Sequence, residues 1–346
     1  MIYNKLFLPY SLSILYLGES TSYAVGIDLG ATNLRVVLAD KNGKFKIKLS
    51  EPTVKTGTSE SLISQIIELI ERSIRQANIK TEEIIGIGIG SIGPLDMKRG
   101  WLLNPPNIPF RDVPIVPRLE EHFGVPATLL NDCTTAVIGE KYFGAGKEHD
   151  NLVYITISTG IGGGAYVDGH LLLGKDGNAV EVGHTVVDAE GRLICGCGKK
   201  GHWEAYCSGT GIPKLARLIL EKKGIKGPEE TLILKMAKGD PSKITAKIVF
   251  EAAKKRDKLA LEIVDLIGRY NAAGIANVID AYDPSLITIG GSVALYNEEL
   301  ILNPIRRYVI EYAINRIPEI IITPLREDVV LYGAVALALG LERIFM

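Results

Sequence analysis

Six side chains that bind metals or hydroxyl groups occur in one short, glycine-rich segment: Glu181, His184, Cys195, Cys197, His202 and Glu204. A Cys-x-Cys pair with one histidine before it and another five residues after it supplies four ligands of the types that zinc prefers. Four protein ligands fill a tetrahedral shell, so we predict a structural zinc ion held by His184, Cys195, Cys197 and His202. Cys207 is an alternative fourth ligand. Both glutamates are then free for another task.

A carboxylate suited to proton transfer follows the short apolar strand that we expect at residues 125–130. There the chain reads Asn131-Asp132 and continues into a helical pattern. Polar residues at the carboxyl ends of strands are common sites of chemistry in α/β folds. We therefore predict that Asp132 accepts a proton from a hydroxyl group, which is the help that phosphoryl transfer to an alcohol needs. The alternative role for Asp132 is the N-cap of the next helix.

Two segments share the pattern of strand, glycine turn and strand: residues 23–40 and residues 152–167. The polar and glycine residues of the two turns are Asp28, Gly30, Thr32 and Asn33, and then Thr159, Gly160 and Gly162. Glycine lets backbone N–H groups approach a phosphate, and an aspartate such as Asp28 can hold Mg²⁺ through water. Either turn alone could be an ordinary β-hairpin, but the repetition favours two duplicated halves.

Other glycine-rich strings match nucleotide motifs in their letters only. Residues 88–93 read Gly-x-Gly-x-x-Gly, but Pro94 and a loop follow where a dinucleotide site needs a helix, which excludes that fold. Residues 169–175 fall short of a P-loop, and Asp176 stands where the required Ser or Thr would be. A further turn, Gly290-Gly291, ends an apolar strand that begins at Ser285.

Composition indicates a globular protein that acts on small molecules. The 346 residues suffice for two domains, and the net charge of -1 gives no sign of nucleic acid or an anionic membrane as a partner. Four cysteines are too few for a disulfide scaffold and fit a reducing cytoplasm. In the N-terminal extension, residues 1–22, the apolar run from Leu6 to Leu17 is too short to span a bilayer. We expect a packed extension, or residues upstream of the true start, rather than a membrane anchor.

The segment from Glu181 to Glu204 resembles the signature of the ROK family (repressors, open reading frames and sugar kinases). That signature reads E-x-G-H and then C-x-C-G-x-x-G-C-x-E. The sequence departs from it at His202, which stands where the family usually has its third cysteine. Further strings match in family order: GSIGPLD at 90–96, NPPNIPF at 104–110, LLNDCTTAVIGE at 129–140 and the Asp-Pro to Gly-Gly segment at 283–291. The resemblance covers residues 23–346.

This resemblance implies a role for each candidate site residue. It makes Asp132 the catalytic base, and it assigns sugar binding to Gly93, Asn107, Asn131, Asp132, Glu181, His184 and Glu204. It implies that ATP and Mg²⁺ are held by Asp28, Gly30, Thr32, Asn33, Thr159, Gly160, Gly162, Gly290 and Gly291. His184 would bind zinc through one ring nitrogen and sugar through the other, so that the metal orients the sugar loop.

The resemblance also implies an α/β fold of two actin-like (ribonuclease H-like) domains with a ligand cleft between them. We expect a small domain of residues 23–137 plus 330–346 and a large domain of residues 138–329 that carries the zinc-binding loop. The family further implies a homodimer or homotetramer.

The function that we expect is that of a hexokinase or glucokinase, which transfers the γ-phosphate of ATP to the 6-hydroxyl of glucose or a related hexose. The first alternative is a kinase for an N-acetylhexosamine, either N-acetylglucosamine or N-acetylmannosamine. The second is a sugar-sensing regulator of the same family. Against the regulator, only 22 mostly apolar residues precede the core where a DNA-binding domain would stand, and both Asp28 and Asp132 are present.

Overall fold

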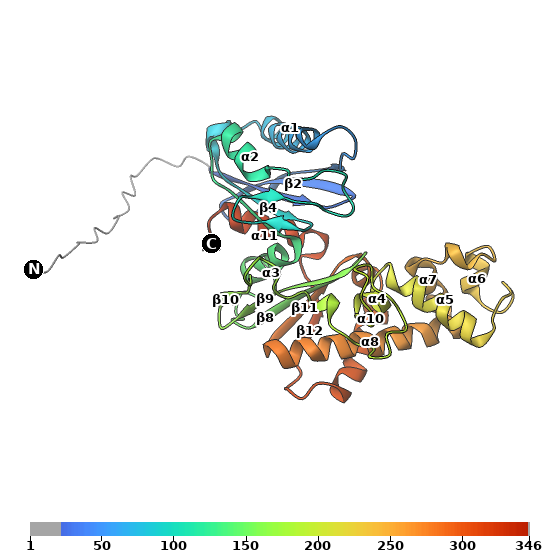
Figure 1. Cartoon of the computed structure of the whole chain (residues 1–346). Coiled ribbons are helices and arrows are strands. Elements are labelled where there is room, and N and C mark those ends of the chain that lie inside the picture. The colour runs from blue at the N-terminus through green and yellow to red at the C-terminus, as the bar shows by residue number, and fades with distance from the viewer. Residues whose placement is uncertain (1–21, 345–346) are drawn as a thin grey trace, which may run out of the picture.

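The protein consists of two lobes that are each built on a five-stranded sheet (Figure 1). The structure is a computed structural model and describes residues 22–344. The expected N-terminal extension therefore lies outside the described residues, apart from Ser22. Within the described residues, no helix is both long and apolar enough to cross a membrane.

The first sheet has the order β3-β2-β1-β4-β7. Its strands are β1 (Tyr23–Leu29), β2 (Asn33–Asp40), β3 (Phe45–Pro52), β4 (Ile84–Ser91) and β7 (Ala127–Asn131). β1, β2 and β3 form antiparallel pairs, whereas β4 runs parallel to β1 and β7 parallel to β4. All seven residues of β1 are buried, as expected for a central strand that is covered on both faces.

The second sheet has the order β10-β9-β8-β11-β12. Its strands are β8 (Leu152–Ile157), β9 (Ile161–Val167), β10 (His170–Leu171), β11 (Leu286–Gly290) and β12 (Glu319–Ile322). The strand directions repeat those of the first sheet, with an antiparallel hairpin side and two parallel strands. The echo between residues 23–40 and 152–167 therefore corresponds to the same hairpin in two duplicated sheets.

Two helices pack against each other between the sheets. α3 (Asp132–Tyr142) contacts β8 and β9, and α11 (Val329–Ala338) contacts β1 and β4. Their backbones approach closely, because a Cβ atom on Gly333 would overlap the Thr135 carbonyl and one on Gly139 would overlap the Val329 carbonyl. Glycine is needed at this crossing, and the pair joins the two lobes.

The remaining helices cover the outer surfaces. In the first lobe these are α1 (Ser59–Ala77), where the apolar spacing predicts a helix, and α2 (Ile115–Phe123), which follows the short hairpin of β5 (Leu95–Asp96) and β6 (Trp101–Leu102). The second lobe carries α4 (Glu204–Cys207), α5 (Gly211–Lys223), α6 (Leu232–Met236), α7 (Ala246–Lys254), α8 (Lys258–Tyr282), α9 (Ser292–Leu295) and α10 (Glu298–Tyr308). Trp203, which is fully buried, packs into the core of this lobe and donates its indole N–H to Asn271 Oδ1 at 2.8 Å.

Candidate active site

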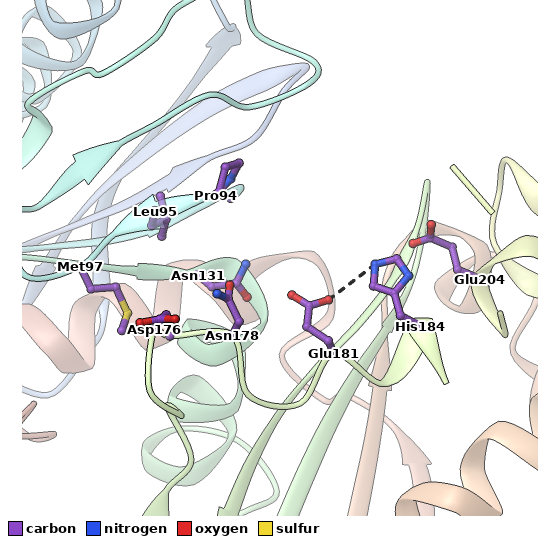
Figure 2. Close-up of a pocket in the computed structure, with 11 residues that line it drawn as sticks. Pro94, Leu95, Met97, Asn131, Asp176, Asn178, Glu181, His184 and Glu204 are labelled. Carbon is purple, nitrogen blue, oxygen red and sulfur yellow. Dashed lines mark ion pairs between the residues drawn. The ribbon is translucent and has the colours of Figure 1, made fainter. Parts of the chain in front are cut away.

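A polar cavity of about 390 Å³ lies between the two lobes. Figure 2 shows residues that line it, which come from the loop after β4 and the adjoining β5, the end of β7, and the segment that runs from β10 to the first residue of α4. The lining residues are Gly93, Pro94, Leu95, Met97, Asn131, Asp176, Gly177, Asn178, Glu181, His184 and Glu204. Five of the predicted sugar-binding residues are therefore gathered around one cavity.

Asp132 is the first residue of α3, and Asn131 is the N-cap. The Asn131 side-chain oxygen accepts hydrogen bonds from the backbone N–H groups of Cys133 at 2.9 Å and Thr134 at 3.4 Å. The alternative interpretation of Asp132 as the N-cap is therefore wrong, because its neighbour fills that position. Burial, and then the negative charge of Asp28, raise the pKa of Asp132 to about 6. A carboxyl group with this pKa is ionised at neutral pH and is a better proton acceptor than an ordinary aspartate.

Three further polar side chains converge on the cavity from one segment of the second lobe. His184 Nε2 lies 3.8 Å from a carboxylate oxygen of Glu181, as the dashed line in Figure 2 marks. Glu204 Oε2 accepts a hydrogen bond from the backbone N–H of Ile161 at 3.0 Å. A Cβ atom on Gly160 would lie 2.5 Å from that same oxygen, so glycine at this position leaves room for the carboxylate.

Four predicted metal ligands lie within one sphere. One possible ligand atom from each of His184, Cys195, Cys197 and His202 lies within 4.8 Å of the other three. The two Nδ1 atoms are 3.2 Å apart, and the Sγ–Nδ1 distances are 3.8 Å for Cys195–His184 and 3.3 Å for Cys197–His202. A tetrahedral zinc ion with two nitrogen and two sulfur ligands requires about 3.3 Å between nitrogens and about 3.6 Å between nitrogen and sulfur. The donor set therefore fits zinc.

Cys207 lies apart from this cluster. It is fully buried, and its thiol donates to the carbonyl oxygen of Ile267 on α8 at 3.5 Å. His202, at the position of the family's third cysteine, lies with the other three ligands instead. Cys195 also donates a hydrogen bond to Glu204 Oε1 at 3.1 Å, so the cluster and the cavity share a wall.

The strands of the β1–β2 hairpin carry a charge pair, Asp28 with Arg35, that our sequence analysis missed. Asp28 is buried and accepts hydrogen bonds from Arg35 on β2, one of them from Nε at 2.8 Å. Burial raises the pKa of Asp28 even though the Arg35 charge opposes that effect. The Gly30 N–H donates to the Asn33 carbonyl at 3.0 Å inside the turn, whereas the side chains of Thr32 and Asn33 are exposed.

A second cavity, of about 660 Å³, lies on the other side of the β8–β9 turn and is formed by that turn, the loop before α5, α7 and α9. It is lined by Ser158, Thr159, Gly209, Thr210, Thr245, Ala246, Lys247, Phe250, Glu251, Lys254, Ser292, Val293, Tyr296 and Asn297. Thr159 faces this cavity, while the neighbouring Gly160 abuts Glu204 of the first cavity. The β8–β9 turn thus separates the two spaces and contacts both.

The predicted Gly-Gly turn lies beside the second cavity. Gly290 ends β11, and Gly291, with φ +85°, precedes α9. Gly162 lies inside β9 instead of at the turn tip, and a Cβ atom there would meet Cys133 Sγ at 2.7 Å. The packing of β9 against α3 therefore accounts for glycine at position 162.

Two predicted sugar ligands are not among the residues that line the first cavity: Asp132, which directly follows the lining residue Asn131, and Asn107. Asn107 is exposed on the loop between β6 and α2. Conversely, the lining includes Asp176 and Asn178, which we did not predict. The sequence feature next to them is the glycine-rich string at residues 169–175, which matched no complete motif.

Comparisons with known proteins agree with this geometry. The sequence profile of the ROK family matches residues 24–340. A glucokinase from Pyrobaculum calidifontis is 37% identical over 315 residues, which is 91% of this chain and 94% of that protein. The crystal structure of a ROK family glucokinase from Streptomyces griseus, in complex with glucose and AMPPNP, is 31% identical with a TM-score of 0.74, covering 91% of this chain and 99% of that one. A ROK hexokinase from Thermus thermophilus is also 31% identical, with a TM-score of 0.73, covering 90% and 96%.

These similarities confirm the family resemblance that the cysteine and E-x-G-H motifs indicated. They also confirm the expected fold class, since the two duplicated α/β sheets belong to the actin-like architecture of ROK sugar kinases. From its motifs, its fold and its relatives together, the chain belongs to the ROK family.

Proposed function

We propose that the protein is an ATP-dependent glucokinase that transfers the γ-phosphate of ATP to the 6-hydroxyl of glucose or a related hexose. One observation carries the proposal. A carboxylate with a pKa of about 6 begins α3 beside a cavity between the lobes, and acceptor and donor groups suited to sugar hydroxyls surround that cavity. The similarity to glucokinases over about nine-tenths of the chain supports the same conclusion.

Asp132 is the proton acceptor in this proposal. As the sugar 6-oxygen forms a bond to the γ-phosphorus, the bond from that phosphorus to the β-γ bridging oxygen breaks and ADP leaves. The hydroxyl proton passes to the Asp132 carboxylate, which is mostly ionised at pH 7 because its pKa is about 6. Its place at the N-terminus of α3 orients the carboxylate, since the helix dipole favours negative charge there.

The remaining sugar hydroxyls are recognised by Asn131, Glu181, His184 and Glu204. Carboxylate oxygens accept from hydroxyls, and the His184 Nε2 atom faces the cavity on the side away from the cysteines. A site that bonds several hydroxyls discriminates strongly against sugars that lack one of them. Gly93 lies at the wall contributed by the first lobe. Asn107 joins the site when the lobes close around the sugar, as closure would also exclude water.

The phosphates of ATP lie between the β1–β2 and β8–β9 turns, and the adenosine occupies the second cavity beside Gly290 and Gly291. Thr159 is a direct candidate for a phosphate contact because it lies at the boundary between the two cavities. Mg²⁺ would be held near Asp28 through water and supplies positive charge to the phosphates. Both Arg35 bonds end on Asp28 Oδ2, so Oδ1 is the oxygen not engaged by Arg35.

A zinc ion held by His184, Cys195, Cys197 and His202 supports the sugar loop. When bound, zinc supplies a rigid tetrahedral anchor and no chemistry of its own. His184 would use Nδ1 for the metal and keep Nε2 for the sugar. We also propose cytoplasmic location, a homodimer or homotetramer, and the domain division at residues 137 and 330.

The test is ADP release coupled to a dye, with Mg-ATP and a panel of hexoses, N-acetylglucosamine and N-acetylmannosamine. Wild type is compared with Asp132→Asn and with the matched control Asp168→Asn, which alters an exposed aspartate in the β9–β10 turn. We expect turnover with glucose that falls by about 10²- to 10⁴-fold in Asp132→Asn and is unchanged in the control. Sugar binding without turnover in the wild type would refute the kinase and leave the sugar-sensing regulator.

A further inference from the structure

The segment between β12 and α11, residues 323–328, is where the chain returns from the second lobe to the first. Its last three residues bond to both lobes: Arg326 to Glu298, Glu327 to Tyr296 and Arg35, and Asp328 to Lys48. Arg326 has φ +54°, a left-handed conformation that non-glycine residues adopt only where the surroundings hold it. This return segment is therefore held by side chains from the turn after α9, from α10, and from β2 and β3.

On the side of the second lobe, the contact involves the wall of the nucleotide cavity. Tyr296 lines that cavity and is 66% exposed. Its hydroxyl donates to the Glu327 carboxylate at 2.8 Å, and its carbonyl accepts from Lys254 Nζ at 3.2 Å. An exposed aromatic ring that is held in place by its hydroxyl is a preorganised surface for a flat ligand group such as a nucleotide base.

On the side of the first lobe, the contact involves the carboxylate beside the catalytic base. Arg35 donates through Nη1 to the backbone carbonyl of Glu327 at 2.7 Å and through Nε to Asp28 Oδ2 at 2.8 Å. Asp28 in turn acts on Asp132 through its charge. One residue, Glu327, thus holds Tyr296 with its side chain and Arg35 with its carbonyl.

We propose that Tyr296, Glu327 and Arg35 are positioning residues that couple occupancy of the nucleotide cavity to the placement of Asp28 beside Asp132. The proposal rests on the proposed function, in which the second cavity binds ATP. A base that packs on Tyr296 favours the arrangement in which Glu327 stays in place. Arg35 then keeps its hydrogen bonds to Asp28 Oδ2, which leaves Oδ1 unengaged by Arg35.

A purely structural role makes a different prediction. If the two bonds of Glu327 only stabilised the fold, then loss of the Tyr296 hydroxyl and weakening of the Arg35 contact would act independently. The effects of independent substitutions multiply, whereas coupled ones do not. A double-mutant cycle with Tyr296→Phe and Arg35→Lys separates the two cases, because phenylalanine keeps the ring and lysine keeps the charge.

The cycle is measured as the Kd for Mg-AMPPNP by calorimetry, which requires no turnover. We expect each single variant to weaken binding by about 2- to 10-fold, since each loses hydrogen bonds. In the double variant, we expect the Kd to lie within about twofold of the Kd of the weaker-binding single variant. A double-variant loss equal to the product of the single losses would overturn the proposal, as would a wild type that does not bind the nucleotide.

The second readout is the pH dependence of kcat/KM for glucose. Arg35→Lys leaves the Asp28 charge less well paired, so the pKa of Asp132 should rise. The acid limb of the kcat/KM profile should then move to higher pH. Tyr296→Phe should move that limb in the same direction, and Tyr312→Phe, on an exposed tyrosine of the second lobe, should not. An unmoved limb in Tyr296→Phe would overturn the coupling. Nucleotide binding without turnover of any sugar would refute the proposed function while the binding cycle still tests this inference.

Discussion

Replacing the carboxylate of Asp132, the proposed proton acceptor, by an amide should inactivate the protein and stabilise its fold. Burial and the Asp28 charge raise the pKa of Asp132 from 3.8 to about 6. A difference of one unit between the folded and unfolded pKa corresponds to about 1.4 kcal/mol. Ionisation of Asp132 therefore destabilises the folded protein by about 3 kcal/mol. Asparagine is isosteric and neutral, and it can still accept the hydrogen bond that Cys133 N–H donates to Asp132 Oδ1 at 2.8 Å. Asp132→Asn should therefore increase the free energy of unfolding by up to about 3 kcal/mol at pH 8.

The dependence on pH gives this prediction its sign. Because the pKa of Asp132 is raised in the folded state, the protonated carboxyl group contributes stability. That stability is fully present below pH 3.8 and is lost as the pH rises through 6. The advantage of Asp132→Asn should thus be about 3 kcal/mol at pH 8, about half of that at pH 5, and close to zero near pH 3.

Urea unfolding of wild type, Asp132→Asn and Asp168→Asn at pH 8 and pH 5, followed by circular dichroism, measures these differences. The control should match wild type at both pH values, because Asp168 is exposed. An Asp132→Asn variant that is no more stable than wild type at pH 8, or whose advantage is equal at the two pH values, would refute the reasoning. Ionisation of Asp132 would then not destabilise the folded protein, and the structure would not support a carboxylate with a raised pKa as the base.

Three further outcomes follow from the site. The kcat/KM for glucose should fall about tenfold between pH 7 and pH 5, as initial rates will show, because protonation of Asp132 removes the base. His202→Ala should lose zinc, measured as metal content, and weaken glucose binding, whereas His202→Cys should retain both, since cysteine also completes a tetrahedral shell. Gly160→Ala should weaken glucose binding by about tenfold in calorimetry, because the added methyl displaces Glu204; unchanged affinity would show that Glu204 does not bind the sugar.

Local sequence patterns predicted those parts of the site that short segments define. The strand before Asn131 and Asp132 and the helix after them could be predicted from hydrophobic periodicity, and the gathering of His184, Cys195, Cys197 and His202 from their spacing. The sequence left one point open, namely whether Asp132 serves as the proton acceptor or as the N-cap of the helix. Asn131 takes the N-cap, and Asp132 accepts one hydrogen bond from the same helix end, from Cys133 N–H to Oδ1. Both residue types suit an N-cap, so the spacing alone could not choose between them.

Contacts between distant segments could not be predicted in the same way. Arg35 lies 292 positions before Glu327 in the sequence, and nothing local marks either residue as a partner of the other. Likewise, Gly162 belongs to a glycine-rich string that resembles a phosphate turn, but its lack of a side chain serves the packing of β9 against α3. A glycine needed for close packing and a glycine needed for a phosphate look identical in a single sequence.

The position of α3 would connect Asp132, the proposed base, to residues far from the cavity. α3 carries Asp132 at its first position and crosses α11 between the sheets, where Gly139 and Gly333 let the two helices touch. α11 begins directly after the return segment that Tyr296 and Arg35 hold. A shift in that segment would move α11 and, through the close crossing, the start of α3. Because interfaces packed this closely do not deform continuously, small changes at the nucleotide cavity can reach the base as a discrete displacement.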